Sequence, residues 1–237
     1  MKTKAKSSLA ILLGCLVMLI VFAVQAATAA RAIPWKKGDK FSFQLQKGSS
    51  AKVTQVTDVR GAVISRSLPD WQTVQVKDIA TCEGKKCVLL QIDRDAPPPE
   101  PKLKNEKFTE QIVAGIDQET GNVLSMKTTL SGAGSVSTST QSALSRTITV
   151  GDFFGPWMLD VDDKYKRSAK NDRATSSLET IGRKKYQGHD CFLVRKTWAF
   201  QEGPTVKLTY WVDVKSRFAV RIEEDGGRIL ELSKDRG

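Results

Sequence analysis

Apolar and polar residues alternate with a period of two along much of the chain. Residues 41–45 read Phe-Ser-Phe-Gln-Leu, and residues 74–76 read Val-Gln-Val. This period places successive side chains on opposite faces of an extended chain, so it predicts half-buried β-strands. The continuous apolar runs at 87–92 and 191–194 fit strands that are covered on both faces.

Turn signals separate these strands and predict hairpins. Asp225-Gly226-Gly227 lies between the apolar stretches 218–223 and 228–232, and Asp-Gly in this setting is a strong hairpin signal. The turn at 119–122 contains Gly121, which can take a positive φ. Consecutive hairpins predict an antiparallel meander, which must hide its edge strands, for example by curling towards a barrel.

The same order of landmarks occurs twice, which predicts two similar halves. Asp117 and Asp213 are expected to start turns, with the side chain of each accepting a hydrogen bond from the backbone N–H two residues on. The landmarks are Gly38-Asp39 and Gly151-Asp152 before a strand, Gly84–Gln91 and Gly188–Arg195 along a strand, and Asp117 and Asp213 at a turn.

Four segments depart from this pattern. Residues 96–101 include four prolines, which cannot donate to a ladder, so this segment is a stiff loop or a recognition segment. Residues 131–142 are small and polar, which fits a flexible connection or a solvent-exposed strand. Residues 104–113 and 157–167 could each form a short helix.

These patterns predict a mostly β fold. We expect a curved antiparallel meander that forms an open or incompletely closed barrel from two similar halves, with few short helices. The expected divisions are a signal peptide at 1–29, a first β half at 30–130, a Ser/Thr/Gly-rich connection at 131–147 and a second β half at 148–237, the two halves making one mature domain.

The first 30 residues have the pattern of a secretory signal. Residues 2–6 carry three lysines and no acid, residues 8–24 are apolar, and small residues fill 26–30. This order predicts a cleaved signal peptide and a periplasmic or secreted protein. An uncleaved membrane anchor is one alternative, and lipid attachment at Cys15, which follows Leu-Leu-Gly, is another.

Without its signal the chain remains basic. The net charge of +11 falls to +8 when the three signal lysines are removed. A basic exported protein can meet anionic lipid or an acidic envelope partner, although the charges are dispersed enough to be an ordinary soluble surface. No recognised nucleic-acid motif is present, so we expect no nucleic-acid partner.

The predicted mature chain has three cysteines. Cys82 and Cys87 have the spacing of a tight turn, so an oxidising compartment favours a disulfide between them, with Cys87–Cys191 as the alternative. Zinc could use these three thiolates with His189, but exported thiols tend to oxidise. We therefore expect a Cys82–Cys87 disulfide, an odd thiol at Cys191, and no metal or cofactor.

Nothing in the sequence indicates a reaction. His189 is the only histidine, and no nucleophile elbow, P-loop or dinucleotide fingerprint occurs. A pair of carboxylates acting on glycans stays open, because sequence does not show which acids face each other. We expect no catalytic residue and no enzyme.

Aromatic residues are the better candidates for a site. A curled sheet of this size can retain an apolar hollow, although packing of the core is the ordinary use of such residues. The candidates to line a hollow are Phe153, Phe154, Trp157, Tyr210 and Trp211.

The second half also resembles a known family. The segments Gly188-x-x-Cys-Phe-Leu-Val, Tyr210-Trp-Val-Asp-x-Lys and Val220-Arg-Ile-Glu resemble the carboxy-terminal part of LolA-like periplasmic proteins, which include lipoprotein carriers and RseB. Ser216-Arg217 replaces the Thr-Gly of that pattern. The resemblance implies an open barrel that binds or carries an apolar ligand, such as lipid or lipoprotein acyl chains, without catalysis. The alternative is an envelope protein that docks a protein partner.

Overall fold

The structure is a computed structural model. All of the described residues belong to one unit, residues 33–237, and the predicted signal segment and Gly151-Asp152 lie outside them. The described residues are 35–49, 55–57, 63–66, 68–98, 101–103, 105–118, 121–142, 155–170, 174–200 and 205–233.

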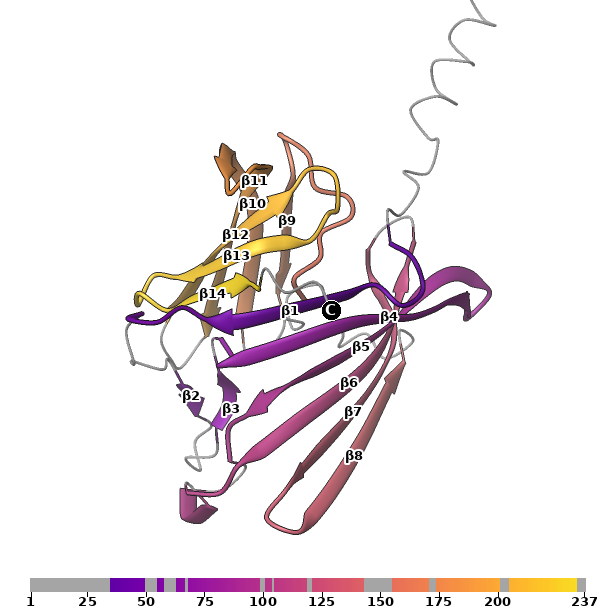
Figure 1. Cartoon of the computed structure of the whole chain (residues 1–237), viewed down its shortest axis with the longest axis vertical. Helices are drawn as coiled ribbons and strands as arrows, with labels where there is room; N and C mark the ends of the chain where they lie inside the picture. The colour runs from indigo at the N-terminus through magenta and orange to yellow at the C-terminus, as the bar shows by residue number, and fades with distance from the viewer. Residues whose placement is uncertain are drawn as a thin grey trace, which may run out of the picture. The chain divides into compact units, whose positions relative to one another are not determined.

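Twelve strands form one antiparallel sheet (Figure 1). Among the described residues no strand pairs with the outer edge of the first or last strand, so the sheet is not closed. The predicted mostly β fold, an open antiparallel meander, is confirmed. The order across the sheet is β8 (Ser135–Ser142), β7 (Val123–Gly132), β6 (Phe108–Asp117), β5 (Lys85–Ala96), β4 (Trp71–Cys82), β1 (Lys40–Leu45), β14 (Ile229–Leu232), β13 (Ala219–Glu224), β12 (Thr205–Asp213), β11 (His189–Phe200), β10 (Ala174–Tyr186) and β9 (Lys166–Lys170).

The meander starts and ends in the middle of the sheet. Strand β1 pairs with β4 on one side and with β14 on the other, where Phe43 lies opposite Leu232. From β1 the chain runs out to one edge at β8, and it resumes at the other edge with β9 and returns to β14. A separate hairpin of β2 (Gln55–Thr57) and β3 (Val63–Arg66) and a 3₁₀ turn η1 (Pro101–Leu103) are also described.

Two segments that could have been helices are not helical. Residues 108–113 belong to β6, which pairs with both β5 and β7. The segment from 157 begins with a bridge between Trp157 and Phe218, continues through turns, and enters β9 at Lys166. In both cases backbone pairing with a neighbouring strand outweighs the weak local helical pattern. Residues 131–142 form the end of β7 and the exposed strand β8.

The two halves share their irregularities, which shows that they are similar. In the β4–β5 pair the register shifts between Val76 and Asp78, and in the β10–β11 pair it shifts between Thr180 and Gly182. The hairpin turns that follow have the same backbone, with φ of 49° and 77° at Glu83-Gly84 and 48° and 85° at Gln187-Gly188. For the register shift and for the turn, each residue of the second half lies 104 positions after its counterpart in the first half.

The next turn repeats as well. After β6 the N–H of Gly121 donates to the carbonyl oxygen of Asp117 at 2.9 Å, and after β12 Arg217 donates to Asp213 at 2.9 Å. Gly121 has a φ of 71° and Arg217 one of 59°, so a non-glycine residue takes the left-handed conformation in the second half. The Asp213 carboxylate accepts hydrogen bonds from the backbone of Lys215 and Ser216, as predicted for a turn-starting residue.

Strands β1 and β9 are equivalent first strands of the two halves. The N–H of Val76 donates to the carbonyl oxygen of Asp39 at 2.9 Å, and Thr180 donates to Tyr165 at the same distance. Tyr165 therefore holds the place of Asp39. The first half comprises β1 and β4–β8, and the second half comprises β9–β14.

One face of the sheet, called the inner face here, carries the main core. It includes Phe43, Val74, Ile92, Ile112 and Tyr210, all buried. Burial of such side chains contributes about 1.5–3 kcal/mol each. Among the described residues, no helix has the length and apolar character needed to cross a membrane.

Candidate functional site

A small hollow lies where the inner face of the second half meets residues 121–123 of the first half. The segment 155–160 and strands β9–β12 form the rest of its wall. Trp157, Met158, Leu159 and Leu178 give it apolar walls, and Tyr210 adds an aromatic ring. The hollow has a volume of about 40 Å³, which is room for about three water molecules. The hollow therefore fits a group of a few heavy atoms as it stands.

Charged side chains share this hollow with the apolar walls. Arg167 on β9 forms an ion pair with Asp160, and it donates to the side-chain oxygen of Asn122 at 3.1 Å. Its guanidinium also lies 5.7 Å from the centre of the Tyr165 ring. Lys196 on β11 lines the same hollow and is only 2% exposed, with its Nζ 5.1 Å from the centre of the Trp198 ring.

Burial controls the protonation of the neighbouring acids. Burial raises the pKa of Asp160, and the attraction of Arg167 offsets this only in part. Burial, with Asp160 next in size, raises the pKa of Tyr165 to about 12. Burial also raises the pKa of Tyr210. The two phenols are thus neutral at physiological pH, which suits hydrogen bonding better than proton abstraction.

The residues at the corresponding positions of the first half can be compared with those that line the hollow. One cross-strand row of the inner face runs through β1, β4, β5 and β6, and its counterpart runs through β9, β10, β11 and β12. We call these the inner rows. The inner row of the first half is Phe41, Val74, Ile92 and Ile112, and that of the second half is Arg167, Leu178, Lys196 and Leu208.

The inner rows differ in polarity at two of four positions, and both changes introduce a cation. Arg167 replaces Phe41, and Lys196 replaces Ile92. Two residues further along β12, Tyr210 pairs with Val194, where Ala114 pairs with Leu90 in the first half. The same backbone is thus lined by apolar side chains in one half and by a mixed polar and apolar set in the other. Charge at these positions is not needed to form the fold.

The aromatic candidates from the sequence lie in different places. Trp157 and Tyr210 line the hollow. Phe153 and Phe154 lie outside the described residues. Trp211 lies on the outer face, because it follows Tyr210 in the same strand and successive side chains point to opposite faces. Trp211 packs there against Tyr186, with ring centres 5.3 Å apart.

Trp211 belongs to a polar and aromatic cluster on the outer face. Arg221 donates to Glu223 at 2.5 Å, to Glu231 at 2.9 Å and to the Tyr186 hydroxyl at 3.2 Å. Burial alone would lower the pKa of Arg221, but hydrogen bonds to Tyr186 and Glu223 raise it. Within the cluster Arg221 is paired with Glu223 and Glu231, whereas the Nε1 of Trp211 is buried and has no hydrogen-bond partner among the described residues.

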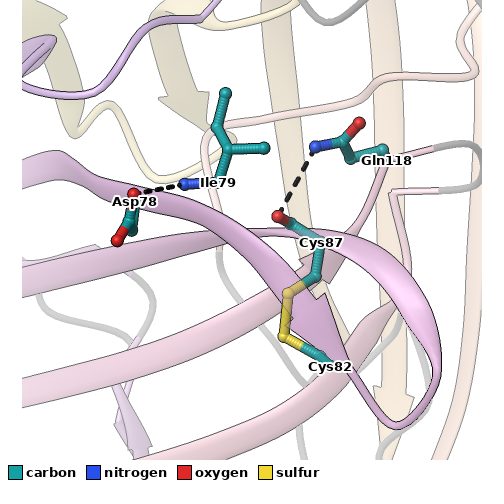
Figure 2. The surroundings of a disulfide bond; sticks show 5 residues. All are labelled: Asp78, Ile79, Cys82, Cys87 and Gln118. Atoms are coloured by element: carbon teal, nitrogen blue, oxygen red, sulfur yellow. Dashed lines mark hydrogen bonds between the residues drawn. A yellow bond between two sulfur atoms is a disulfide. The ribbon is translucent and has the colours of Figure 1, made fainter.

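Cysteine chemistry separates the two halves. Figure 2 shows the disulfide between Cys82 and Cys87 at the β4–β5 hairpin, as predicted. Its presence indicates an oxidising compartment. Cys191 occupies the place of Cys87 in the second half, but it is free and fully buried. Burial, followed by the nearby Asp213 and Asp190, raises the pKa of Cys191 to about 12.

Sequence reasoning missed Arg167 and Lys196 as site residues. Among the described residues, no group of three metal-ligating side chains converges, and Cys82 and Cys87 are held as a disulfide rather than as thiolates. The chain matches no protein-family model, no curated protein and no solved structure.

Proposed function

We propose that this protein is an exported, non-enzymatic binding protein that holds an amphipathic ligand at the inner face of its second half. The observation that carries the proposal is the pair of cations, Arg167 and Lys196, which line an otherwise apolar hollow where the first half has Phe41 and Ile92. Apolar side chains fill the same two positions in the first half, so the fold does not require a cation at either of them.

Export is supported by two features of the chain. The pattern of residues 1–30 fits a signal peptide, and the disulfide fits an oxidising compartment. The resemblance of the segments from Gly188 to Glu223 to LolA-like periplasmic proteins points the same way, since it implies an open barrel that receives acyl chains.

Binding rather than catalysis is supported by the chemistry of the hollow. Among the described residues that line it, Asp160 is the one carboxylate, and Arg167 forms an ion pair with it. Burial raises the pKa of Tyr165 to about 12, so the phenol is a poor general base near neutral pH. Apolar walls with a few polar groups are typical of ligand sites that select by shape and one polar end.

The proposal is tested by identifying what the protein carries. The protein, exported by a bacterial host and purified without detergent, is extracted with organic solvent, and the extract is analysed by mass spectrometry. We expect an amphipathic compound near one per protein. Val123→Phe places a large ring at the wall of the hollow and should deplete this compound, whereas Val136→Phe, on the exposed strand β8, should not.

Two results would contradict the proposal. One is an extract without any stoichiometric compound, combined with no displacement of an apolar fluorescent dye by dodecanol or dodecanoate. The other is equal loss of the compound in Val123→Phe and Val136→Phe, which would place binding on the surface rather than in the hollow.

A further inference from the structure

We infer that one end of the sheet is a docking surface for a membrane that contains anionic lipid. This surface, called the basic end here, comprises the loops and strand ends at residues 35–39, 83–86, 184–190 and 214–217. The inference goes beyond the proposed function, and it does not depend on a ligand in the hollow.

Hydrogen bonds show that the segments of the basic end lie together. The Nε1 of Trp35 donates to the carbonyl oxygen of Ser216 at 2.6 Å. The N–H of Val214 donates to the carbonyl oxygen of Asp190 at 2.9 Å. The N–H of Gly38 donates to β4, which continues into the β4–β5 hairpin. Loops from both halves of the protein therefore meet at the same end of the sheet.

Each segment of the basic end carries exposed lysines. Lys37 pairs with Asp78 at 3.4 Å and Lys85 with Asp117 at 3.6 Å, yet these two lysine side chains are 70% and 64% exposed. The other lysines of this end form no ion pair with any residue that the structure describes. The exposed lysines are Lys36, Lys37, Lys85, Lys86, Lys184, Lys185 and Lys215.

The acids at this end are mostly engaged within the protein. The Asp39 carboxylate accepts a hydrogen bond from the N–H of Lys36 at 2.7 Å. The buried carboxylate of Asp213 accepts hydrogen bonds from the backbone of its own turn. Within the four segments Glu83 and Asp190 are the exposed acids, and Asp190 lies 3.9 Å from Arg183. The exposed charge of the basic end is therefore mainly positive.

The opposite end of the sheet exposes charges of both signs. Lys207 there lies beside Asp225, whose N–H donates to the carbonyl oxygen of Lys207 at 3.1 Å. This uneven distribution of charge orients the molecule in the field of an anionic surface, with the basic end towards it. The exposed charged residues of the opposite end include Lys47, Lys107 and Lys207 with Asp70, Glu106 and Asp225.

The type of cation fits a lipid surface better than a shaped partner. Lysine is a flexible, hydrated point charge, whereas arginine is suited to planar, bidentate recognition. The arginines beside these lysines are used within the protein. Arg183 donates to the Asp163 carboxylate at 2.6 and 2.9 Å, and Arg217 donates to the carbonyl oxygen of Val161 at 2.5 Å. Lysines spread over four segments can meet a broad anionic membrane without forming a pocket.

Exposed apolar side chains accompany the lysines. Ile79 on β4 is 52% exposed and Ile181 on β10 is 42% exposed, and each lies shortly before the hairpin at the basic end. Apolar side chains of this kind can enter the boundary between headgroups and acyl chains while nearby cations contact the phosphates. The basic end thus combines both contributions to membrane binding.

The hollow lies towards the same end. Asn122, which lines it, follows β6, and the N–H of Gln118 in the same turn donates to the carbonyl oxygen of Lys86 at 3.1 Å. Docking by the basic end would bring the hollow close to the lipid surface. A protein that carries an amphipathic compound collects or delivers it at such a surface.

The test measures sedimentation of the protein with lipid vesicles. The protein beginning at Ala30 is used, so that the apolar residues 8–24 take no part. Vesicles of phosphatidylcholine alone are compared with vesicles of an equal mixture of phosphatidylcholine and phosphatidylglycerol. We expect binding to the mixed vesicles only, and loss of this binding when salt is raised to about 1 M, where the Debye length is about 3 Å.

A matched pair of triple variants assigns the binding to the basic end. Each lysine near an anionic surface strengthens binding about fivefold, so removing three should weaken it about a hundredfold. The control removes the same charge at the opposite end and should bind within about threefold of the unmodified protein, because the attraction falls off within a Debye length. The first variant combines Lys86→Gln, Lys185→Gln and Lys215→Gln, and the control combines Lys47→Gln, Lys107→Gln and Lys207→Gln, all at exposed residues.

Three results would overturn the inference. They are no binding to the mixed vesicles, equal binding to both kinds of vesicle, and an equal loss in the two triple variants, which would mean that net charge rather than the basic end decides. Binding to polyglutamate without binding to vesicles would also overturn it, in favour of an acidic protein partner. None of these results changes what is extracted from the hollow, so the proposed function is tested separately.

Discussion

The two halves of this protein have the same backbone and different side-chain chemistry. Both bulges recur at corresponding residues, at Val76 and Thr180 in one pair of strands and at Gly115 and Trp211 in the other. The turns recur with them, including the left-handed residues before the second strand of each hairpin. Turn and bulge geometry thus define the scaffold, while the residues on its faces are free to differ.

The outer faces differ at a pair of contacting positions. In the first half the disulfide of Cys82 lies against Gly115, and a Cβ at Gly115 would be 2.8 Å from the Cys82 sulfur. In the second half Tyr186 takes the place of Cys82, and Trp211 takes that of Gly115. A covalent bond over a glycine in one half thus corresponds to a stacked aromatic pair in the other.

The inner faces differ in the polarity of their side chains. The inner row of the first half packs the core, whereas that of the second half lines the hollow with Arg167 and Lys196. A duplicated scaffold allows this division, because one half can maintain stability while the other accepts costly polar groups.

The largest change in stability is expected when the first half is given a lysine at the position that corresponds to Lys196. Ile92→Lys puts a lysine at a position that is 2% exposed among apolar neighbours. We expect the free energy of unfolding to fall by about 4 kcal/mol or more, because an unpaired buried charge is left. Urea unfolding followed by tryptophan fluorescence measures it.

Ile79→Lys is the matched control for that variant. It makes the same substitution at a residue that is 52% exposed in the first half, so its effect should stay within about 0.5 kcal/mol. A comparable loss in both variants would mean that general charge repulsion, rather than burial in the row, is responsible.

The disulfide should have the second largest effect. The double substitution Cys82→Ala and Cys87→Ala removes a short covalent loop, so we expect the free energy of unfolding to fall by about 2 kcal/mol. Dithiothreitol should destabilise the unmodified protein by the same amount and leave the double variant unchanged. Cys191→Ala should keep its sensitivity to dithiothreitol, because Cys191 is not bonded. Insensitivity of the unmodified protein to reduction would contradict the expectation.

Much of the scaffold follows from the sequence, because its signals are local. The Asp225-Gly226-Gly227 hairpin, the Cys82–Cys87 staple and the repeated landmarks each involve neighbouring residues. The pairing of β1 with β14 joins residues nearly two hundred positions apart, such as Phe43 and Leu232, and no local pattern indicates it. The helical readings of 104–113 and 157–167 failed because pairing with distant strands decided their structure.

Sequence reasoning missed Lys196 because the alternation of apolar and polar residues is interrupted just before it. The apolar run 191–194 breaks the period of two, so the facing of Lys196 does not follow from its neighbours. Alignment of the two repeated halves could have identified Lys196. The match of Gly84–Gln91 with Gly188–Arg195 extends by one residue to place Lys196 against Ile92, a lysine in a row of core residues.

A smaller effect is expected from the aromatic pair that replaces the disulfide. In a double-mutant cycle with Tyr186→Ala and Trp211→Ala, we expect a coupling energy of about 1 kcal/mol, because tilted aromatic rings at this distance interact by about 0.5–1.5 kcal/mol. Chemical unfolding of the four proteins measures it. Pairing Trp211→Ala with Val136→Ala, far along the sheet on β8, supplies the control cycle, for which additivity is expected.

The smallest effect is expected from the reverse of the first substitution. Lys196→Ile gives the second half the residue that the first half holds in the same row, between Leu178 and Leu208. Isoleucine fits this backbone, and burial of its side chain contributes about 1.5–3 kcal/mol, which offsets the loss of the interactions that Lys196 makes. The free energy of unfolding should therefore change by no more than about 1 kcal/mol. Urea unfolding compares it directly with Ile92→Lys. A loss of about 3 kcal/mol or more would show that Lys196 is a structural member of a buried ion pair, and the contrast between a packing half and a binding half would then fail at the residue on which it depends most.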